Sequence, residues 1–565
     1  MEKNRGVVKE NPHWIYYLLA VWGILNIIQS IFTELDPDEA YYWIYSLELA
    51  WGYFDHPSAI AILVKLGTSI IDSELGVRLG IIFCQLGYIY FLWLILDKPS
   101  SRKTFLTFTA LLVSFPTLQV YGFVATPDGP LLLFTSIFLY LYKRFLGSPK
   151  HVGLALLWGI SMALLLYSKY HGILVIGFTV LSNLKLFTQR NFYLAGIFGF
   201  LLFFPHLYWQ YANDFPSFRY HLVGRDDEYE LKYTLNYLLN QVINFGPFIF
   251  PLAVIAVFKW KKKEAFFRTA MFLVIGFILF FFLMSFKGHV EPQWTIAVCF
   301  PLTILMYHYA ANHEKFDVWL KRAALVTFSL VLIIRVLIFI ELPIKANPFL
   351  NKVWVDELEE YAGGSPILME NSYRSASLYA FYTRKPISTF TTITYRRNQF
   401  DLRDDEKDFH NKRTLLLGEC RQCVKTSFGN GKTFRQTFVD SLQIFQKVEI
   451  YPEVPDLRLK VGNQEKLVIP VKIYNPYDHE IKLDVSQVGV QFTYTLDAKD
   501  GYYHSQTINE GDLPTIIPVS DTIMGRFQFS LPDSLLENSY LSFGMTYDSM
   551  PPKILSDRIA LEVVE

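Results

Sequence analysis

The chain has 565 residues, of which 52% are hydrophobic and only 18% are charged, and its formal net charge is zero. A soluble globular protein carries about 25% charged residues, so this composition argues against a soluble protein and favours a membrane protein. The balance of 52 basic and 52 acidic residues also gives no electrostatic argument for nucleic-acid binding.

Apolar runs of membrane-spanning length alternate with short polar connectors up to about residue 340. The first run lacks a small-residue cleavage pattern, so we interpret it as a retained span rather than a signal peptide. A helix needs about 20 apolar residues to cross the bilayer, which predicts about eleven spans. They lie near residues 14–33, 76–96, 104–123, 129–143, 153–168, 171–187, 192–212, 236–258, 265–286, 293–311 and 319–340.

The connectors between these runs are of two alternating kinds. One kind is rich in Lys and Arg, which places it and the N-terminus in the cytoplasm by the positive-inside rule. The other kind carries acidic, His and aromatic residues and is therefore extracytoplasmic, as is everything after residue 340. The chain has no Asn-x-Ser/Thr sequon, which favours a bacterial inner membrane.

The character of the chain changes after the last apolar run. Residues 1–340 form the predicted membrane domain, and residues 341–445 are interpreted as an extracytoplasmic mixed α/β domain, with a helix at 352–362 and strands near 366–370 and 414–418. Alternating apolar and polar residues at 457–461 and 467–473 then predict an extracytoplasmic β-sandwich over 446–565.

The four cysteines suggest structural roles. Cys84 and Cys299 lie in apolar runs, where a buried inert thiol is expected. Cys420 and Cys423 form a C-x-x-C motif without a second ligand pair nearby, so a zinc site is not indicated. A local disulfide and a redox pair both stay open for this motif.

The first outer loop begins with Asp36, Asp38 and Glu39 and continues to a second polar cluster that contains Asp55 and His56. Helices lying in the interface are expected over residues 41–50 and 59–71. Asp38 and Glu39 could simply cap and open a helix. Alternatively, a desolvated carboxylate could act as a base for a hydroxyl acceptor, or several could hold a divalent metal.

The run D-E-A-Y-Y-W-I-Y-S-L-E-L-A-W-G-Y-F-D-H-P at residues 38–57 resembles the first outer loop of the bacterial protein-mannosyltransferase-like (PMT-type) glycosyltransferases. These are GT-C fold enzymes that take a sugar from a polyprenyl-phosphate carrier, and the lipid A aminoarabinose transferases are a related branch. Supporting similarities at 126–130, 168–170, 373–382 and 397–402 extend the resemblance over residues 10 to about 420.

The resemblance implies roles for three residues of the loops. The family's acidic residue of the first outer loop, a catalytic base or a metal-linked acid, falls on Asp38, and the acidic residue that opens the fourth span falls on Asp128. His56 departs from the basic Lys expected before the proline in the aminoarabinose branch. Contact with the carrier phosphate at His56 would then depend on protonation.

Further polar residues of the outer loops are candidates for substrate binding. Lys169 could contact the carrier phosphate or extend to the lipid headgroups, and Arg225 could bind phosphate or pair with its acidic neighbours. His221, His289 and Glu291 could line the same cavity or form ordinary polar turns.

These observations predict an integral membrane glycosyltransferase that transfers a sugar, with inversion, from a polyprenyl-phosphate donor to an extracytoplasmic acceptor. The acceptor could be a glycolipid, an envelope polysaccharide or a protein, and a divalent metal at Asp38 and Glu39 is left open. A lipid or polysaccharide flippase or transporter is the rival, but it would place charges at mid-bilayer rather than at the outer ends of spans. A non-catalytic assembly factor is a third interpretation.

Overall fold

The computed structural model describes residues 13–222, 229–339, 348–429, 431–454, 456–460, 466–483, 489–497, 503–531, 539–547 and 550–564. The chain divides into two compact units, Met1–Leu350 and Asn351–Glu565.

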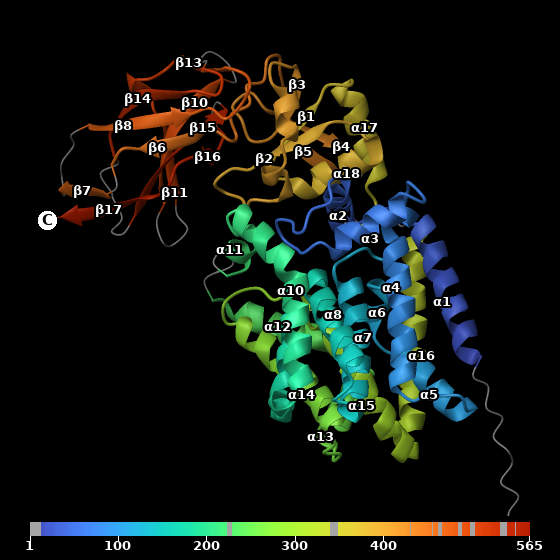
Figure 1. The fold of residues 1–565 in the computed structure, drawn as a ribbon. Coiled ribbons are helices and arrows are strands. Elements are labelled where there is room, and N and C mark those ends of the chain that lie inside the picture. Colours follow the sequence, from blue (N-terminus) through green and yellow to red (C-terminus); the bar gives the residue numbers. More distant parts are fainter. Residues whose placement is uncertain are drawn as a thin grey trace, which may run out of the picture. The chain divides into compact units, whose positions relative to one another are not determined.

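The first unit is made of helices (Figure 1). They are α1 (Trp14–Ile31), α2 (Pro37–Leu47), α3 (Ala59–Thr68), α4 (Glu74–Ile95), α5 (Arg102–Val113), α6 (Pro116–Val120), α7 (Asp128–Gly147), α8 (Val152–Ser168), α9 (Gly172–Ser182), α10 (Arg190–Ala212), α11 (Pro216–Leu222), α12 (Leu231–Asn244), α13 (Phe250–Phe258), α14 (Ala265–Met284), α15 (Cys299–Asn312) and α16 (Glu314–Phe339), with the 3₁₀ helices η1 (Leu184–Thr188) and η2 (Pro292–Val298).

Five helical segments in the described part of the chain are long and apolar enough to cross a membrane, by length and composition: α1, α4, α10, α14 and the continuous segment of η2 and α15. The polytopic helical fold class is thus confirmed, whereas the predicted count of about eleven spans stays a prediction. The other predicted spans coincide with helices that are shorter, interrupted or more charged.

Two predicted spans are interrupted for identifiable reasons. The span expected at 104–123 is split between α5 and α6, because Phe115 precedes Pro116 and takes an extended conformation. The span expected at 236–258 is split between α12 and α13. There Gly246 has a φ of +80°, a left-handed conformation that favours glycine, and Pro247 follows it.

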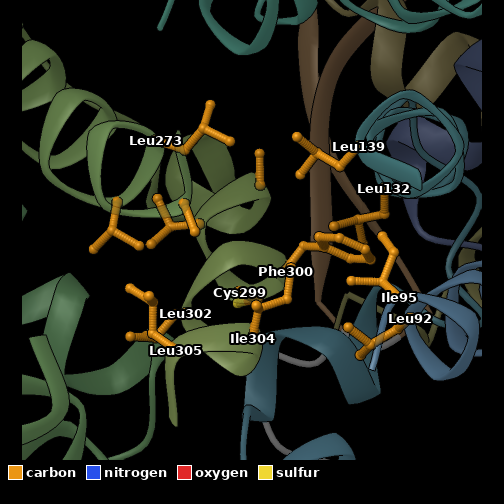
Figure 2. Packing of buried hydrophobic residues seen from close by; sticks show 14 of the residues in the cluster. Leu92, Ile95, Leu132, Leu139, Leu273, Cys299, Phe300, Leu302, Ile304 and Leu305 are labelled. Atoms are coloured by element: carbon orange, nitrogen blue, oxygen red, sulfur yellow. The ribbon is translucent and has the colours of Figure 1, made fainter. Parts of the chain in front are cut away.

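The core of the first unit surrounds the segment of η2 and α15, which is 83% buried. Figure 2 shows α15 contributing Cys299, Phe300 and Ile304 to this core, and the Phe300 ring extends toward Leu132 of α7 and Ile95 of α4. Buried Leu273 comes from α14 on the other side. Helix α15 is therefore the central helix of the bundle rather than a lipid-facing one.

Helices α7, α8 and α10 run side by side (Figure 1). The approach of α8 and α10 is close because small residues face each other. A methyl group added at Gly159 would lie 2.5 Å from the Ala195 carbonyl oxygen, and one at Gly199 would lie 2.8 Å from the Gly159 carbonyl oxygen. Small residues allow close helix packing in membranes, where apolar burial alone gives little driving force.

The second unit begins with a five-stranded sheet flanked by helices α17 (Lys352–Ala362) and α18 (Tyr373–Thr383). The strand order is β2-β1-β3-β5-β4, with β1 parallel to both neighbours. These strands are β1 (Ile367–Glu370), β2 (Ile387–Phe390), β3 (Thr414–Leu417), β4 (Val424–Phe428) and β5 (Lys432–Val439). The helix predicted at 352–362 and the strands predicted near 366–370 and 414–418 are confirmed.

The rest of the second unit is β-structure. One sheet has the order β11-β10-β15-β17-β7 with β16 beside β15, a second has the order β12-β14-β8-β6, and β13 pairs with β9. The strands are β6 (Glu449–Pro452), β7 (Asp456–Lys460), β8 (Leu467–Tyr474), β9 (Ile481–Lys482), β10 (Val490–Asp497), β11 (Tyr503–Thr507), β12 (Glu510–Asp512), β13 (Ile516–Ile517), β14 (Thr522–Phe529), β15 (Tyr540–Tyr547), β16 (Lys553–Ile554) and β17 (Ile559–Val564).

The two larger sheets of this region meet through buried aromatic rings. The Phe527 ring of β14 lies 4.9 Å from Phe492 of β10 and 5.1 Å from Phe543 of β15. One hydrophobic cluster continues from these strands to Leu368 and Leu416 of the mixed sheet. The predicted division of this region at residue 445 stays a prediction.

The cysteines have structural positions. Cys420 and Cys423 form a disulfide in the loop between β3 and β4, and both are buried in the cluster of the second unit. Cys84 and Cys299 are buried free thiols, as expected.

Candidate active site

The acidic run that follows α1 begins helix α2. Asp36 is the N-cap, because its carboxylate accepts a hydrogen bond from the Asp38 backbone N–H at 2.9 Å. The Glu39 carboxylate accepts one in return from the Asp36 N–H at 2.9 Å, which completes a capping box around Pro37. The helix therefore starts before the predicted residue 41. The half-buried Asp38 side chain lies in its first turn, where the helix dipole favours a carboxylate.

Glu39 is fully buried and forms a bidentate ion pair with Arg78 of α4. Nε and Nη2 of Arg78 donate to the two carboxylate oxygens at 2.8 and 2.5 Å, and both side chains are 0% exposed. The Ala125 backbone N–H is a further donor to Glu39, at 2.7 Å. Arg78 also donates to backbone carbonyls at the end of α1 and in the following loop, namely those of Ser30, Thr33 and Glu34.

Glu39 thus receives four charge-assisted or backbone hydrogen bonds, which occupy both oxygens. A buried ion pair is stable only when such additional bonds satisfy its remaining donors and acceptors. These contacts support a positioning role that joins α2, α4 and the segment before α7. The catalytic role predicted for Glu39 stays a prediction, and these contacts do not favour it.

The segment that leads from α6 to Asp128 is held by buried polar side chains. Asn26 of α1 donates to the Gly122 carbonyl at 3.2 Å, and Gln85 of α4 donates to the Leu118 carbonyl at 2.7 Å. Arg335 of α16 donates to the Gln119 carbonyl at 2.6 Å and to Asn26 Oδ1 at 2.8 Å. Arg335 therefore holds this segment.

Asp128 and Lys169 form a second buried ion pair. Nζ of Lys169 lies 2.8 and 3.0 Å from the two Asp128 carboxylate oxygens, and the side chains are 7% and 3% exposed. Asp128 stands in the first turn of α7, and Lys169 is the C-cap of α8. Each charge is therefore favoured by its helix dipole. The two residues predicted from separate motifs are direct partners.

Tyr121, which directly follows α6, lies within electrostatic range of four carboxylates from three stretches of the chain, Asp128, Asp36, Glu291 and Asp38. This range relates the first loop, the start of α7 and the segment before η2 to one another. The buried Asp128–Lys169 pair is the main geometric feature of the candidate site.

A second group forms around the turn that contains Asp55. A backbone bridge joins Gly52 and Pro57 across the turn, and the Tyr53 N–H donates to the His56 carbonyl at 3.0 Å. The buried Asp55 carboxylate accepts from the Tyr45 hydroxyl of α2 at 3.0 Å. Burial first, and then the Asp55 charge, raise the pKa of Tyr45, so Tyr45 is a neutral donor at ordinary pH.

His56 and His221 of α11 belong to this second group. Nε2 of His221 donates to the Asp55 carbonyl at 3.1 Å, and the two imidazole centroids lie 6.4 Å apart. The Tyr170 ring lies 5.6 Å from that of His221, and burial raises the pKa of Tyr170. Because Tyr170 follows Lys169 in the chain, it connects this group with the Asp128–Lys169 pair.

A hydrogen-bonded chain fixes Tyr170. Nδ1 of His206 of α10 donates to the Trp51 carbonyl at 2.8 Å, so Nε2 can accept from the Tyr170 hydroxyl at 3.1 Å. Gln210 donates to the Tyr170 oxygen at 3.0 Å. These residues couple α10 to the turn at Trp51.

The remaining predicted residues are less enclosed. His289 and Glu291 lie 3.8 Å apart at Nε2 and Oε2, and both side chains are nearly half exposed. Arg225 lies outside the described residues. Among the described residues, no group of three or more His, Cys, Asp or Glu side chains is placed to hold a metal ion. Because the Glu39 oxygens are already occupied, the residues do not fit the suggested metal at Asp38 and Glu39, and no step is derived through one.

Sequence reasoning did not single out Arg78, Tyr121 or His206. Arg78 had a signal, because an arginine inside an apolar span is rarely present without a buried partner. His206 had the same signal, as an ionisable residue inside an apolar run, whereas Tyr121 had none because tyrosines are common throughout the spans.

Comparisons with known proteins bear on this site. The model of the dolichyl-phosphate-mannose-protein mannosyltransferase family matches residues 55–209. The lipid A galacturonosyltransferase RgtD of Rhizobium johnstonii is 24% identical over 290 residues, which are 48% of this chain and 60% of that protein. The chain thus spans about 60% of the length of this curated relative.

Solved structures share the fold. The structure of ArnT from Cupriavidus metallidurans in the apo state matches with a TM-score of 0.58 and 13% identity, over 75% of this chain and 97% of that one. The structure of the same ArnT bound to undecaprenyl phosphate matches with a TM-score of 0.56 and 15% identity, over 75% and 98%. The predicted resemblance to the PMT-type proteins of the GT-C fold, related to the lipid A aminoarabinose transferases, is confirmed.

Proposed function

We propose that the protein is an integral membrane glycosyltransferase that moves a sugar from a polyprenyl-phosphate donor to an extracytoplasmic acceptor. The observation that carries the proposal is the buried Asp128–Lys169 ion pair, and Tyr121, within electrostatic range of Asp128, Asp38 and Glu291, relates the first loop to this pair. The relatives agree with it, because RgtD is named as a lipid A galacturonosyltransferase and the ArnT structure was solved with undecaprenyl phosphate.

Asp38 acts as the general base in this proposal. Its carboxylate is half-buried in the first turn of α2, beside the N-cap Asp36. It would take the proton of the acceptor hydroxyl while that oxygen bonds to the anomeric carbon and the lipid phosphate leaves. A single displacement of this kind inverts the anomeric centre. If the acceptor is itself a phosphate, Asp38 would orient it instead.

Lys169 binds the phosphate of the donor in this proposal. The ammonium group has three N–H donors, and two of them reach Asp128. The third can meet a phosphate oxygen, while Asp128 keeps the ammonium charged and oriented. His56, His221 and Asp55 would bind other parts of the substrates, and Arg225 and His289 stay candidates for the same task.

The proposed setting is a bacterial inner membrane, with the N-terminus in the cytoplasm and the second unit on the extracytoplasmic side. The alternation of basic and acidic connectors supports this orientation. The acceptor would then be a glycolipid, an envelope polysaccharide or a protein on that side.

The test compares wild type with Asp38→Asn in membranes supplied with radiolabelled polyprenyl-phosphate sugars. Asn keeps the size of the side chain and removes the base, so we expect transfer to fall by about 10²–10⁴-fold. Asp72→Asn, which changes an exposed carboxylate outside the site, is the matched control and should transfer normally. Equal transfer by wild type and Asp38→Asn would refute the catalytic assignment and favour the assembly-factor or transporter interpretation.

A further inference from the structure

The second unit contains a cavity of about 600 Å³ that lies within that unit alone. It is bordered by residues 391–401, which follow strand β2, by residues 446–449, which lead into β6, and by residues 553–555 at β16. Its position at the carboxyl end of β2, beside the parallel strand β1, is where α/β sheets commonly bind ligands. Its volume falls within the range of about 300–1,000 Å³ that is typical of small-ligand sites.

The charges that line the cavity are balanced. The basic residues Arg397, Lys447 and Lys553 face an equal number of acidic ones, Asp401, Glu406 and Glu449. A ligand with a large net charge would therefore find no excess of the opposite sign.

Several of these charged side chains form ion pairs and hydrogen bonds with one another. Nζ of Lys553 lies 2.6 Å from Asp401, which accepts from the Thr391 hydroxyl and the Asn398 N–H as well. Lys447 pairs with Asp404 and lies 3.6 Å from Glu406. These groups form a rigid polar wall, and they offer little uncompensated charge to a ligand.

One polar group of the wall differs from the rest, namely the side-chain amide of Gln446. Gln446 is 6% exposed, and its Nε2 has no hydrogen-bond partner among the residues that the structure describes. A buried amide without a partner is costly by about 1–3 kcal/mol, so such a group usually meets a ligand or water. An amide in this position matches a ligand hydroxyl, which can accept its hydrogen bond.

Aromatic and hydroxyl side chains complete the lining. Tyr395 and Phe400 offer apolar surface, and Thr391 and Thr392 add hydroxyl groups that are hydrogen-bonded within the wall. A sugar ring has one face of C–H groups, which suits an aromatic side chain, and an edge of hydroxyls, which suits amide, hydroxyl and guanidinium groups. This mixture of neutral polar and aromatic groups is the chemistry that recognises a carbohydrate.

We propose that this cavity binds a neutral oligosaccharide, with Gln446 and Arg397 donating to its hydroxyls. The inference rests on the proposed function in one respect: the oligosaccharide would be part of the acceptor, which the second unit binds for the membrane site. This inference narrows the class of acceptor to molecules that carry a saccharide.

The test measures binding of maltotriose, cellotriose and mannotriose to the full-length protein by titration calorimetry. The protein is held in lipid nanodiscs, because sugar-based detergents would compete for the cavity. We expect saturable binding of at least one trisaccharide, about tenfold weaker in both Gln446→Leu and Arg397→Ala, since each removes one hydrogen-bond donor. Gln528→Leu and Arg526→Ala, on strand β14 outside the cavity, are the matched controls and should bind like wild type.

Three results would overturn the proposal: absence of saturable binding, wild-type affinity in both cavity variants, or tighter binding of trigalacturonate than of any neutral trisaccharide. Arg397→Ala alters an exposed side chain, so the test stays decisive if Gln446→Leu fails to fold. Asp38→Asn should bind trisaccharide normally. Failure of the transfer assay and failure of this binding assay are therefore distinguishable.

Discussion

The two buried ion pairs of the first unit differ in how completely they are satisfied. In the Glu39–Arg78 pair, the carboxylate accepts four hydrogen bonds, and the guanidinium also reaches three backbone carbonyls. In the Asp128–Lys169 pair, the two side chains have only each other as side-chain hydrogen-bond partners among the residues that the structure describes. Both pairs are almost fully buried.

This difference indicates that one pair has a structural role and the other a role in substrate binding. A saturated pair has no donor or acceptor left for a substrate, so its effect is to hold backbone segments in place. A pair with an unused ammonium N–H keeps a charged group that can bind an incoming phosphate. The two ion pairs are alike in burial and in charge. They differ in the number of hydrogen-bond partners that their side chains have.

The largest expected effect comes from breaking the saturated pair. Glu39→Gln leaves the Arg78 guanidinium buried without a counter-charge, so we expect unfolding to become easier by about 3–5 kcal/mol. The midpoint of thermal unfolding in nanodiscs measures this loss. Arg78→Lys should not preserve stability, because lysine cannot form the bidentate contact. A Glu39→Gln protein that unfolds like wild type but transfers no sugar would instead make Glu39 catalytic.

A smaller effect on stability, with a large effect on transfer, is expected at the second pair. Lys169→Met should lower transfer by about 10²–10³-fold, because a charged donor to the leaving phosphate is lost. The double variant Asp128→Asn, Lys169→Met removes both charges, so it should regain most of the lost thermal stability without regaining transfer. If the double variant instead recovers sugar transfer, the Asp128–Lys169 pair has a structural role, as the Glu39–Arg78 pair does.

The smallest effect concerns a histidine of the second unit. The His410 ring stacks on His479 at 3.5 Å between centroids, and its Nδ1 accepts a hydrogen bond from the Ile444 N–H. Burial first, and then the neighbouring His479, lower the pKa of His410 to about 4 from its ordinary value of 6.5.

The sign of the pH effect follows from this shift. Between pH 6.5 and about 4 the unfolded state binds the proton more readily, so stability falls as the pH is lowered through that range. Because the His410 ring is partly exposed, solvent screens the effect, and we expect a loss of folding stability of about 1 kcal/mol over this range. His410→Asn, which can still accept from the Ile444 N–H, should flatten the pH dependence of the unfolding midpoint. His504→Asn on β11 should not, and an equal flattening there would contradict the assignment.

Much of the fold could be predicted from local patterns. Apolar runs located the helices of the first unit, and alternation located strands β7 and β8 and the surrounding sandwich. The interruptions could be anticipated only in part. Pro116 and Gly246 were visible in the sequence, but whether such residues kink a span or divide it depends on the helices packed around them.

The candidate site could be predicted as a set of residues but not as a set of partners. The motifs indicated Asp38, Asp128, Lys169, Asp55 and His221, and the structure brings them into two neighbouring groups within the first unit. The pairing of Asp128 with Lys169 joins residues 41 positions apart in the chain, and no local pattern specifies such a contact.

By itself, the sequence determined that this is a helical membrane protein that resembles the PMT-type proteins, since composition and short motifs carry that information. Only the tertiary structure decided which carboxylates have their hydrogen-bonding positions filled by other groups of the protein. Glu39 meets Arg78 and Ala125, which lie 39 and 86 positions away, and these long-range contacts arise from helix packing rather than from sequence spacing. Asp38, its neighbour in the motif, faces another direction, because consecutive residues of a helix do not lie on the same face.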